Sequence, residues 1–176
     1  MSQALRTQVT VQAATQAGAE PNGTDVVEPA LVEAYFKAFA SRDPAVFGAY
    51  LHDDVVWTIS GPIDVIPYCG THRGKAAVID VMARRARNLL RDVKVKREKF
   101  LIDGNRGAAL TRLTGRLADD SRIVSYRVAN FFRFQDGKVI ENVSLMDSFD
   151  AAEQVLGHAI EVGDAPPLAD DNLVIL

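Results

Sequence analysis

The stretch from Ser121 to Asp150, SRIVSYRVANFFRFQDGKVIENVSLMDSFD, decides the fold of this chain. Its first half alternates between two sets of side chains, and one set consists of Val124, Tyr126, Val128, Asn130, Phe132 and Phe134. A period of two is typical of a β-strand whose two faces differ in environment. The dipeptide Asp136-Gly137 then supplies the positive φ angles that a two-residue hairpin turn requires. The stretch therefore predicts two long antiparallel strands joined by a tight turn.

The residues before this hairpin predict helices first and strands later. We expect helices over about 28–41, 43–51 and 75–90, and strands over about 55–60, 93–102 and 106–117. Residues 62–74 read as a loop, and Asp150 with Glu153 forms a capping-box pattern that starts a short last helix. A block of helices followed by consecutive antiparallel strands indicates an α+β fold, with the helices covering one face of a curved sheet.

With 176 residues, the chain is expected to form one folded domain with room for a substantial core. We place this domain at residues 26–160. Residues 1–25 contain no aromatic side chain and are predicted to be a flexible arm. Residues 161–176 contain Pro166-Pro167 and are predicted to be a C-terminal tail.

The composition argues against several classes of protein. A net charge of −3 gives no reason to expect a nucleic-acid partner. Cys69 is the only cysteine, and the three histidines match no metal-ligand spacing, so neither a disulfide nor a metal site is expected. No phosphate-binding loop or dinucleotide fingerprint is present, so no cofactor is expected. No apolar run approaches the roughly 18 residues of a membrane span, and a cytoplasmic location is expected.

Several phrases, in this order and spacing, resemble the SnoaL-like proteins of the nuclear transport factor 2-like superfamily. The phrases are Tyr35–Phe39 with Arg42-Asp43, Asp54–Trp57, Pro67–Lys75, Asp136–Glu141 and Met146–Ser148. The resemblance covers about Glu28 to Leu156. It implies a cone-shaped roll, in which a strongly curved antiparallel sheet wraps around N-terminal helices and encloses an apolar pocket. It also implies frequent homodimers. Polyketide cyclases, ketosteroid isomerase, scytalone dehydratase and limonene-epoxide hydrolase share this superfamily, and fold alone does not separate their functions.

The resemblance to the cyclases places their catalytic His at Asn130 and their catalytic Asp at Ser144. An amide and a hydroxyl can hold a carbonyl or a water, but they cannot transfer protons near neutral pH. Two functions therefore remain open. The first is a cofactor-independent acid/base enzyme of the isomerase, dehydratase or cyclase type, acting on a small apolar oxygenated compound. The second is a non-catalytic ligand-binding or dimerisation module of the same fold.

Asp147 and His72 are the candidate catalytic residues. Asp147 is either a base at the pocket mouth or a helix cap. His72 is either the proton shuttle that an imidazole makes possible near pH 7 or an exposed turn residue. The predicted substrate-binding residues are Trp57, Tyr68, Met82, Asn130, Phe132, Asn142 and Ser144.

Two further expectations follow from the alternation in the hairpin. Asn130 shares a strand face with Val128 and Phe132, so its amide points inward, where it would cost roughly 1–3 kcal/mol if left unpaired. We expect it to be hydrogen-bonded to Asn142 or Ser144 on the pocket floor and to hold a water or a ligand oxygen there. Phe131 lies on the opposite face and is too apolar to leave in water, which predicts a homodimer that buries it.

Overall fold

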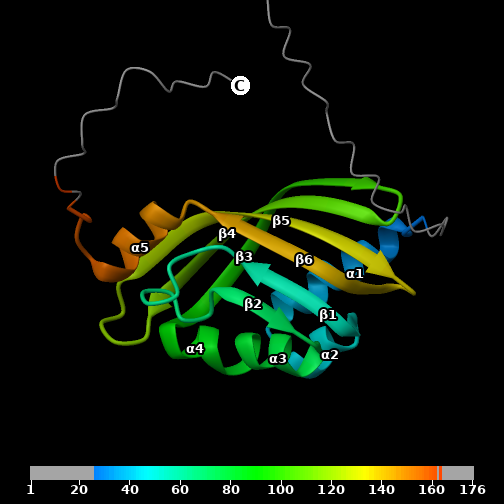
Figure 1. Ribbon diagram of the computed structural model, residues 1–176, viewed down its shortest axis with the longest axis horizontal. Helices are drawn as coiled ribbons and strands as arrows, with labels where there is room; N and C mark the ends of the chain where they lie inside the picture. Colours follow the sequence, from blue (N-terminus) through cyan, green and yellow to red (C-terminus); the bar gives the residue numbers. More distant parts are fainter. Residues whose placement is uncertain (1–25, 162, 164–176) are drawn as a thin grey trace, which may run out of the picture.

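Residues 26–161 and 163 are described by a computed structural model, in which one curved sheet packs against helices (Figure 1). The sheet has six strands in the order β2-β1-β6-β5-β4-β3. Neighbouring strands are antiparallel, except that β1 and β6 are parallel. The strands are β1 (Leu51–Ile59), β2 (Gly70–Arg73), β3 (Leu90–Asp103), β4 (Arg106–Leu117), β5 (Ile123–Gln135) and β6 (Lys138–Met146).

Local sequence signals explain where the first helices begin. Pro29 opens the first helix, a position where its missing N–H costs no hydrogen bond. The Asp43 carboxylate accepts hydrogen bonds from the backbone N–H groups of Ala45 and Val46 and so caps the second helix. The helices are α1 (Pro29–Ser41), α2 (Pro44–Gly48), α3 (Lys75–Asp80), η1 (Val81–Arg85, a π-helical turn), α4 (Ala86–Leu89) and α5 (Ser148–Leu156).

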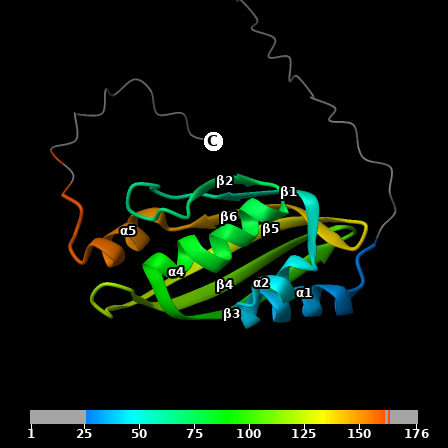
Figure 2. The same cartoon turned by 90° about the horizontal axis from the view of Figure 1, so that it is seen from below.

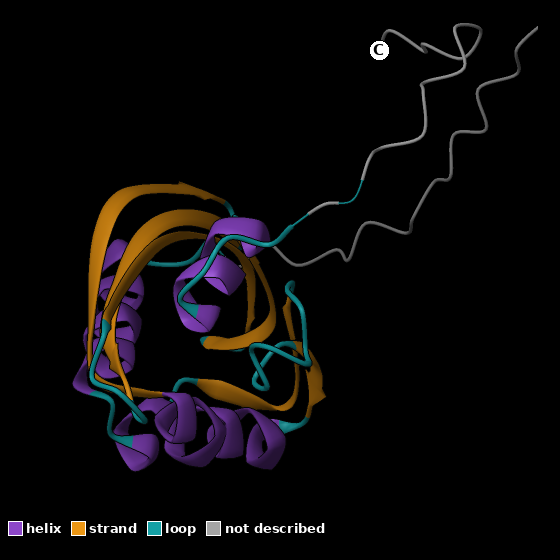
Figure 3. Ribbon diagram, turned by 90° about the vertical axis from the view of Figure 1, so that its left-hand side faces the viewer, coloured by secondary structure: helices purple, strands orange, loops and turns teal. Residues whose placement is uncertain are grey.

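The strong curvature of the sheet turns this arrangement into a cone. Figure 3 looks along the molecule and shows the strands bending around an interior, while Figure 2 shows α3 and α4 lying across the open side. Register shifts occur between Arg91 and Lys94, and between Arg97 and Lys99, where β3 pairs with β4. Such irregularities bend a strand and increase its twist. The predicted α+β cone is confirmed.

The β5–β6 hairpin matches the sequence prediction closely. Asp136 and Gly137 have φ angles of 51° and 69°, so the turn uses the positive φ values that Asp-Gly supplies. On β5 the predicted inward residues are buried, except for Asn130, which is half-buried. Phe131 is 50% exposed on the convex face, as expected for the opposite side of the strand.

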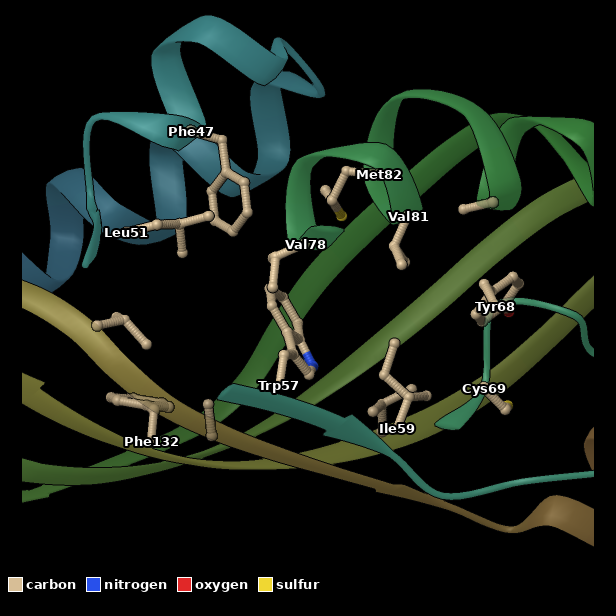
Figure 4. Packing of buried hydrophobic residues seen from close by; sticks show 14 of the residues in the cluster. Phe47, Leu51, Trp57, Ile59, Tyr68, Cys69, Val78, Val81, Met82 and Phe132 are labelled. Carbon is tan, nitrogen blue, oxygen red and sulfur yellow. The ribbon is translucent and has the colours of Figure 1, made fainter. Parts of the chain in front are cut away.

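An aromatic cluster fills one end of the cone. Its rings lie with centroids 5.3 to 6.0 Å apart, and it consists of Tyr35, Phe36, Phe39, Phe47, Trp57, Phe100, Phe132 and Phe134. Phe132 lies across from Gly107 on β4, and any Cβ at position 107 would collide with the Phe132 ring. Figure 4 shows Phe47 and Phe132 toward this end, Trp57 in the middle, and Tyr68 toward the other end.

The structure corrects three boundaries. Residues 70–73, expected in a loop, form β2, because they pair with β1 across the sheet. Strand β1 begins at Leu51 and not at residue 55, and the helix before it ends at Gly48 and not at residue 51. Helix α5 begins at Ser148 because Asp147, and not Asp150, is its capping residue.

The predicted N-terminal arm and most of the predicted tail lie outside the described residues. Within residues 26–161, none of the helices is both long and apolar enough to cross a membrane.

Candidate active site

A cavity of about 80 Å³ lies between the concave face of the sheet and the helical segment from α3 to α4. Apolar side chains make up most of its wall, including Trp57, Val78, Val81, Met82, Leu113 and Val128. The polar or charged groups that line it are Arg42, Tyr68, His72, Thr111, Tyr126, Asn130 and Ser144. An apolar pocket with a few converging polar groups is the usual form of a small-molecule site.

A chain of hydrogen bonds runs across the floor of this cavity. The Trp57 indole N–H donates to Ser144 Oγ at 2.8 Å, and the Ser144 hydroxyl donates to Asn130 Oδ1 at 2.8 Å. Asn130 Nδ2 donates to Thr111 Oγ1 at 3.3 Å and to the Val128 carbonyl oxygen at 3.4 Å. The Thr111 hydroxyl donates to the same carbonyl oxygen at 3.1 Å. The predicted pairing of Asn130 with Ser144 is therefore confirmed.

We call these four residues, Trp57, Thr111, Asn130 and Ser144, the floor network. Its hydrogen-bond donors are all bonded to acceptors within the protein. The indole N–H, both hydroxyl hydrogens and both amide hydrogens of Asn130 are directed at protein acceptors. Only acceptor lone pairs remain for a ligand. The floor therefore has no donor to spare for a ligand oxygen unless one of these bonds is broken.

A pair of tyrosines supplies donors on another part of the wall. The hydroxyls of Tyr68, from the loop before β2, and Tyr126, on β5, are hydrogen-bonded to each other. Burial raises the pKa of Tyr68 well above its usual value, and the neighbouring Tyr126 raises it further. Burial also raises the pKa of Tyr126. Both phenols are therefore neutral at pH 7, and one of their two hydroxyl hydrogens is left over after the mutual bond.

His72 is buried in the cavity wall, and one of its ring nitrogens is hydrogen-bonded to the backbone. Its Nε2 lies 3.0 Å from the Tyr68 carbonyl oxygen, which can only accept, so Nε2 carries a hydrogen. In the neutral ring Nδ1 is then the acceptor, and no described side chain or backbone group is hydrogen-bonded to it. His72 pairs with Trp57 across β2 and β1, which explains why both side chains face the interior.

Arg42 brings a permanent positive charge to the cavity. It sits between α1 and α2 with a left-handed φ of 58°, and its Nη1 lies 3.8 Å from Met82 Sδ. Burial lowers the pKa of this guanidinium, and the positive charge of Arg87 lowers it further. Among the described residues, no carboxylate forms an ion pair with Arg42.

Six predicted site residues are brought together here: Trp57, Tyr68, His72, Met82, Asn130 and Ser144. Of the other three, Asp147 is exposed, and its Oδ1 accepts a hydrogen bond from the Asp150 backbone N–H at 3.1 Å. This corrects the expectation of a base at the pocket, because the carboxylate caps α5 instead. Phe132 is corrected as well, since its ring does not line the cavity and packs inside the aromatic cluster.

Asn142 requires a third correction. It is only 1% exposed and pairs in register with both Trp57 and Phe132, but it does not line the cavity. Its Oδ1 has no hydrogen-bond partner among the described residues. Asn142 therefore belongs to the core between the cavity and the aromatic cluster.

Sequence reasoning missed Arg42, Thr111 and Tyr126. Tyr126 belongs to the inward set of β5, so the period of two already placed it inside. Nothing local marks Arg42 as a cavity residue, because its side chain reaches the cavity beside Met82, which is forty residues away in the sequence. Among the described residues, no group of three or more His, Cys, Asp or Glu side chains is arranged to hold a metal ion.

Comparisons with known proteins agree with this architecture. The family model of the SnoaL-like domain matches residues 32–142. A "putative isomerase" from Rhodopseudomonas palustris is 30% identical, with a TM-score of 0.64 over 73% of this chain and 94% of that one. An NTF2-like protein from Burkholderia pseudomallei is 21% identical, with a TM-score of 0.65 over 72% of this chain and 95% of that one.

An LEH-like epoxide hydrolase from M. tuberculosis has the same fold, with 20% identity and a TM-score of 0.58 over 73% of this chain and 88% of that one. The curated proteins give no significant match. The family model covers more than half of the chain, and the cone fold is the one that the sequence phrases implied. This chain is a member of the SnoaL-like family, within the nuclear transport factor 2-like superfamily.

Proposed function

We propose that this protein is a cofactor-independent acid/base enzyme acting on a small, largely apolar, oxygenated compound, with His72 as the group that transfers the proton. The observation that carries the proposal is the buried imidazole in the cavity wall, with Nε2 bound to the Tyr68 carbonyl and Nδ1 left to accept a proton. The similarity to the Rhodopseudomonas palustris protein, described as an isomerase, supports chemistry of this type.

The geometry supports a simple division of roles. Nδ1 of His72 takes a proton from the carbon next to a substrate carbonyl, and the C–H electron pair moves toward the carbonyl oxygen to give an enolate. The hydrogen left over in the Tyr68–Tyr126 pair donates to that oxygen as its charge develops. The Tyr68 carbonyl, already bonded to Nε2–H, stabilises the imidazolium that forms. In a substrate with a C=C bond between the β- and γ-carbons this enolate is a dienolate, and return of the proton from Nδ1 to the γ-carbon, with the double bond moving between the α- and β-carbons, completes an isomerisation.

Hydrogen exchange tests this proposal without knowledge of the natural substrate. Ketones with acidic α-hydrogens, such as 1-indanone and 2-tetralone, are incubated with the protein in D2O, and deuterium uptake is followed by NMR. We expect uptake above the buffer rate with the parent protein and its loss in His72→Gln, which keeps a hydrogen-bonding side chain. His158→Gln, which changes an exposed histidine, is the matched control. Equal uptake by the parent and His72→Gln would contradict the proposed role.

A second candidate function is a non-catalytic ligand-binding module of the same fold. It is favoured by one observation: Asn130 and Ser144, at the positions of the cyclase dyad, are bonded to each other and cannot exchange protons near pH 7. Trp57 is the single tryptophan and contacts the cavity floor, so its fluorescence reports ligand entry. Compounds that shift this fluorescence but never take up deuterium would identify a binding module.

We also propose that the protein is a homodimer formed through the convex face of the sheet. Phe131 and Leu145 are 50% and 44% exposed there. Phe131 also lines a shallow groove together with Ala108 and Val143. Apolar side chains gathered on a sheet face are typical of a surface that is covered in the assembled protein.

A further inference from the structure

Arg42 brings a positive charge to a cavity whose walls are mostly apolar. It is the only permanently charged side chain among the described residues that line the cavity, and neither Asp nor Glu lines it. Burial removes bound water from a guanidinium, which costs free energy, and a bonded carboxylate usually offsets that cost. Here Nη1 of Arg42 donates instead to the thioether sulfur of Met82, a weak acceptor, at 3.8 Å.

The surroundings of Arg42 outside the cavity carry the same sign. A hollow on the outer side shares Arg42, Leu90 and Val93 with the cavity and adds Arg87, Arg91 and Asp92. Asp92, the one carboxylate there, lies 3.9 Å from Arg116, so its charge is partly balanced. A positive approach to a cavity concentrates and steers anionic ligands.

The remaining polar groups favour the same position for a ligand oxygen. The floor network has no donor to spare, so donors for a ligand come from Arg42, from the tyrosine pair and, when it is protonated, from His72. Arg42 lies close enough to Tyr68 and Tyr126 for its charge to act on both hydroxyls. A guanidinium presents several N–H groups in one plane, and a carboxylate accepts such groups on both oxygens, while the spare phenol hydrogen remains for a carbonyl oxygen of the same ligand.

We infer that the ligand of this cavity is a small apolar compound with one carboxylate, which is bound by Arg42 while the apolar body lies against Val78, Val81 and Leu113. Such a compound would be the substrate of the proposed enzyme, and only its turnover rests on the proposed function. Binding of the carboxylate itself depends on Arg42 alone and is measured separately.

Benzoate and benzamide are suitable probes, because they share size and shape and differ in charge. We expect benzoate to bind the parent protein at least about tenfold more tightly than benzamide at low salt, as a charge-assisted hydrogen bond allows. Affinities are measured by Trp57 fluorescence and by calorimetry. Added salt is expected to weaken benzoate binding and to leave benzamide binding unchanged.

Variants assign this preference to one side chain. Arg42→Met keeps most of the apolar stem and should remove the preference for benzoate while benzamide binding is retained, and Arg42→Lys should restore part of it. Arg127→Met removes the same charge from the convex face, where Arg127 pairs with Glu98, and should change neither affinity. Retained benzamide binding also shows that Arg42→Met is folded.

The outcomes separate this inference from the proposed function. Equal affinity for the two probes, or equal losses for both in Arg42→Met, overturns the carboxylate site whatever the exchange experiment gives. A second outcome is a preference for benzoate that depends on Arg42, with no deuterium uptake into any ketone, whether or not the ketone carries a carboxylate. This outcome supports the carboxylate site and overturns the proposed enzyme. The third outcome is deuterium uptake that requires His72 for every ketone and requires Arg42 only for ketones that carry a carboxylate. This outcome supports the enzyme and the carboxylate site together.

Discussion

Ser144 and Asn130 face each other across β6 and β5, and the Ser144 hydroxyl donates to the Asn130 amide oxygen at 2.8 Å. Ser144 also accepts the Trp57 indole N–H, so a single hydroxyl satisfies one donor and one acceptor on two neighbouring strands. These are the two positions to which the sequence resemblance assigns the proton-transferring dyad of the cyclases, and here they belong to a closed hydrogen-bond network. We therefore propose His72 and the tyrosine pair, and not these two positions, as the groups that would transfer a proton and hold the substrate oxygen.

Replacement of Ser144 tests the structural value of this network. Ser144→Ala leaves the Trp57 N–H and the Asn130 amide oxygen without their partner, and we expect the free energy of unfolding to fall by about 1–3 kcal/mol. Urea denaturation followed by Trp57 fluorescence measures the change. Thr58→Val is the matched control, because it removes a hydroxyl from an exposed bond to Thr71. A loss no larger than that of the control would show that the network contributes little.

Gly107 tests the packing at the other end of the cone. A Cβ at this position would collide with two carbons of the Phe132 ring, and that ring is also in contact with Tyr35, Phe36, Phe100 and Phe134. We expect Gly107→Ala to lower the free energy of unfolding by about 1–3 kcal/mol, the usual range for overpacking.

Gly104→Ala does not serve as a control for this change, because φ at that turn is positive. Gly163→Ala is the matched comparison, because a Cβ at that position meets no atom within 4 Å and its φ is not in the positive region. Thermal unfolding followed by circular dichroism measures both variants. A Tm for Gly107→Ala equal to that of the parent would show that the aromatic cluster rearranges without cost.

Local patterns in the sequence were sufficient for most of the fold. Alternation along β5, Asp136-Gly137 at the turn and Asp43-Pro44 before α2 each act within a few residues, so they can be read without the tertiary structure. Strand β2 could not be found in this way. Its four residues have no alternation of apolar side chains and become a strand only because β1 offers an edge to pair with.

The site was predictable to the same degree and for the same reason. Inward residues of the strands, such as Asn130 and Ser144, follow from the period of two. The role of Asp147 did not follow from the sequence, because a carboxylate before a helix can be either a base or a cap. Its hydrogen bond from the Asp150 N–H shows that it is a cap. Arg42 enters the cavity from a helix end, where no periodicity fixes the direction of a side chain.

Cys69 gives the stability of the fold a defined dependence on alkaline pH. Burial raises the pKa of its thiol from 9.0 to about 11 in the folded protein. Between these values the unfolded state loses the proton and the folded state keeps it, so unfolding becomes easier as pH rises. The contribution is fully present below the unfolded pKa and is lost as pH approaches the folded value. Burial raises the pKa of Tyr35 and Tyr68 in the same direction.

We therefore expect the free energy of unfolding to be level around pH 8 and to fall progressively above about pH 9, where an unperturbed thiol ionises. Urea titrations at a series of pH values measure this slope. Cys69→Ser removes the thiol and should make the decline shallower between the two pKa values. An identical slope in the parent and in Cys69→Ser would assign the whole alkaline effect to the tyrosines.

Phe131 tests the proposed assembly. It lies on the convex face of β5, opposite Ala108 on β4 and Val143 on β6, and is 50% exposed in the single chain. We expect the parent protein to sediment as a dimer and Phe131→Glu to sediment as a monomer, because burial of two carboxylates at a twofold contact is unfavourable. Val26→Glu introduces the same charge at a side chain that is 72% exposed and should remain dimeric.

The cavity gives this experiment a second measurement. Phe131 points away from the interior, so a monomeric Phe131→Glu should bind benzoate with the affinity of the parent if the site is complete within one chain. Loss of binding together with loss of the dimer would mean that the second copy contributes to the site. A parent protein that sediments as a monomer at all concentrations would contradict the proposed dimer directly and would leave the exposed Phe131 and Leu145 to another partner.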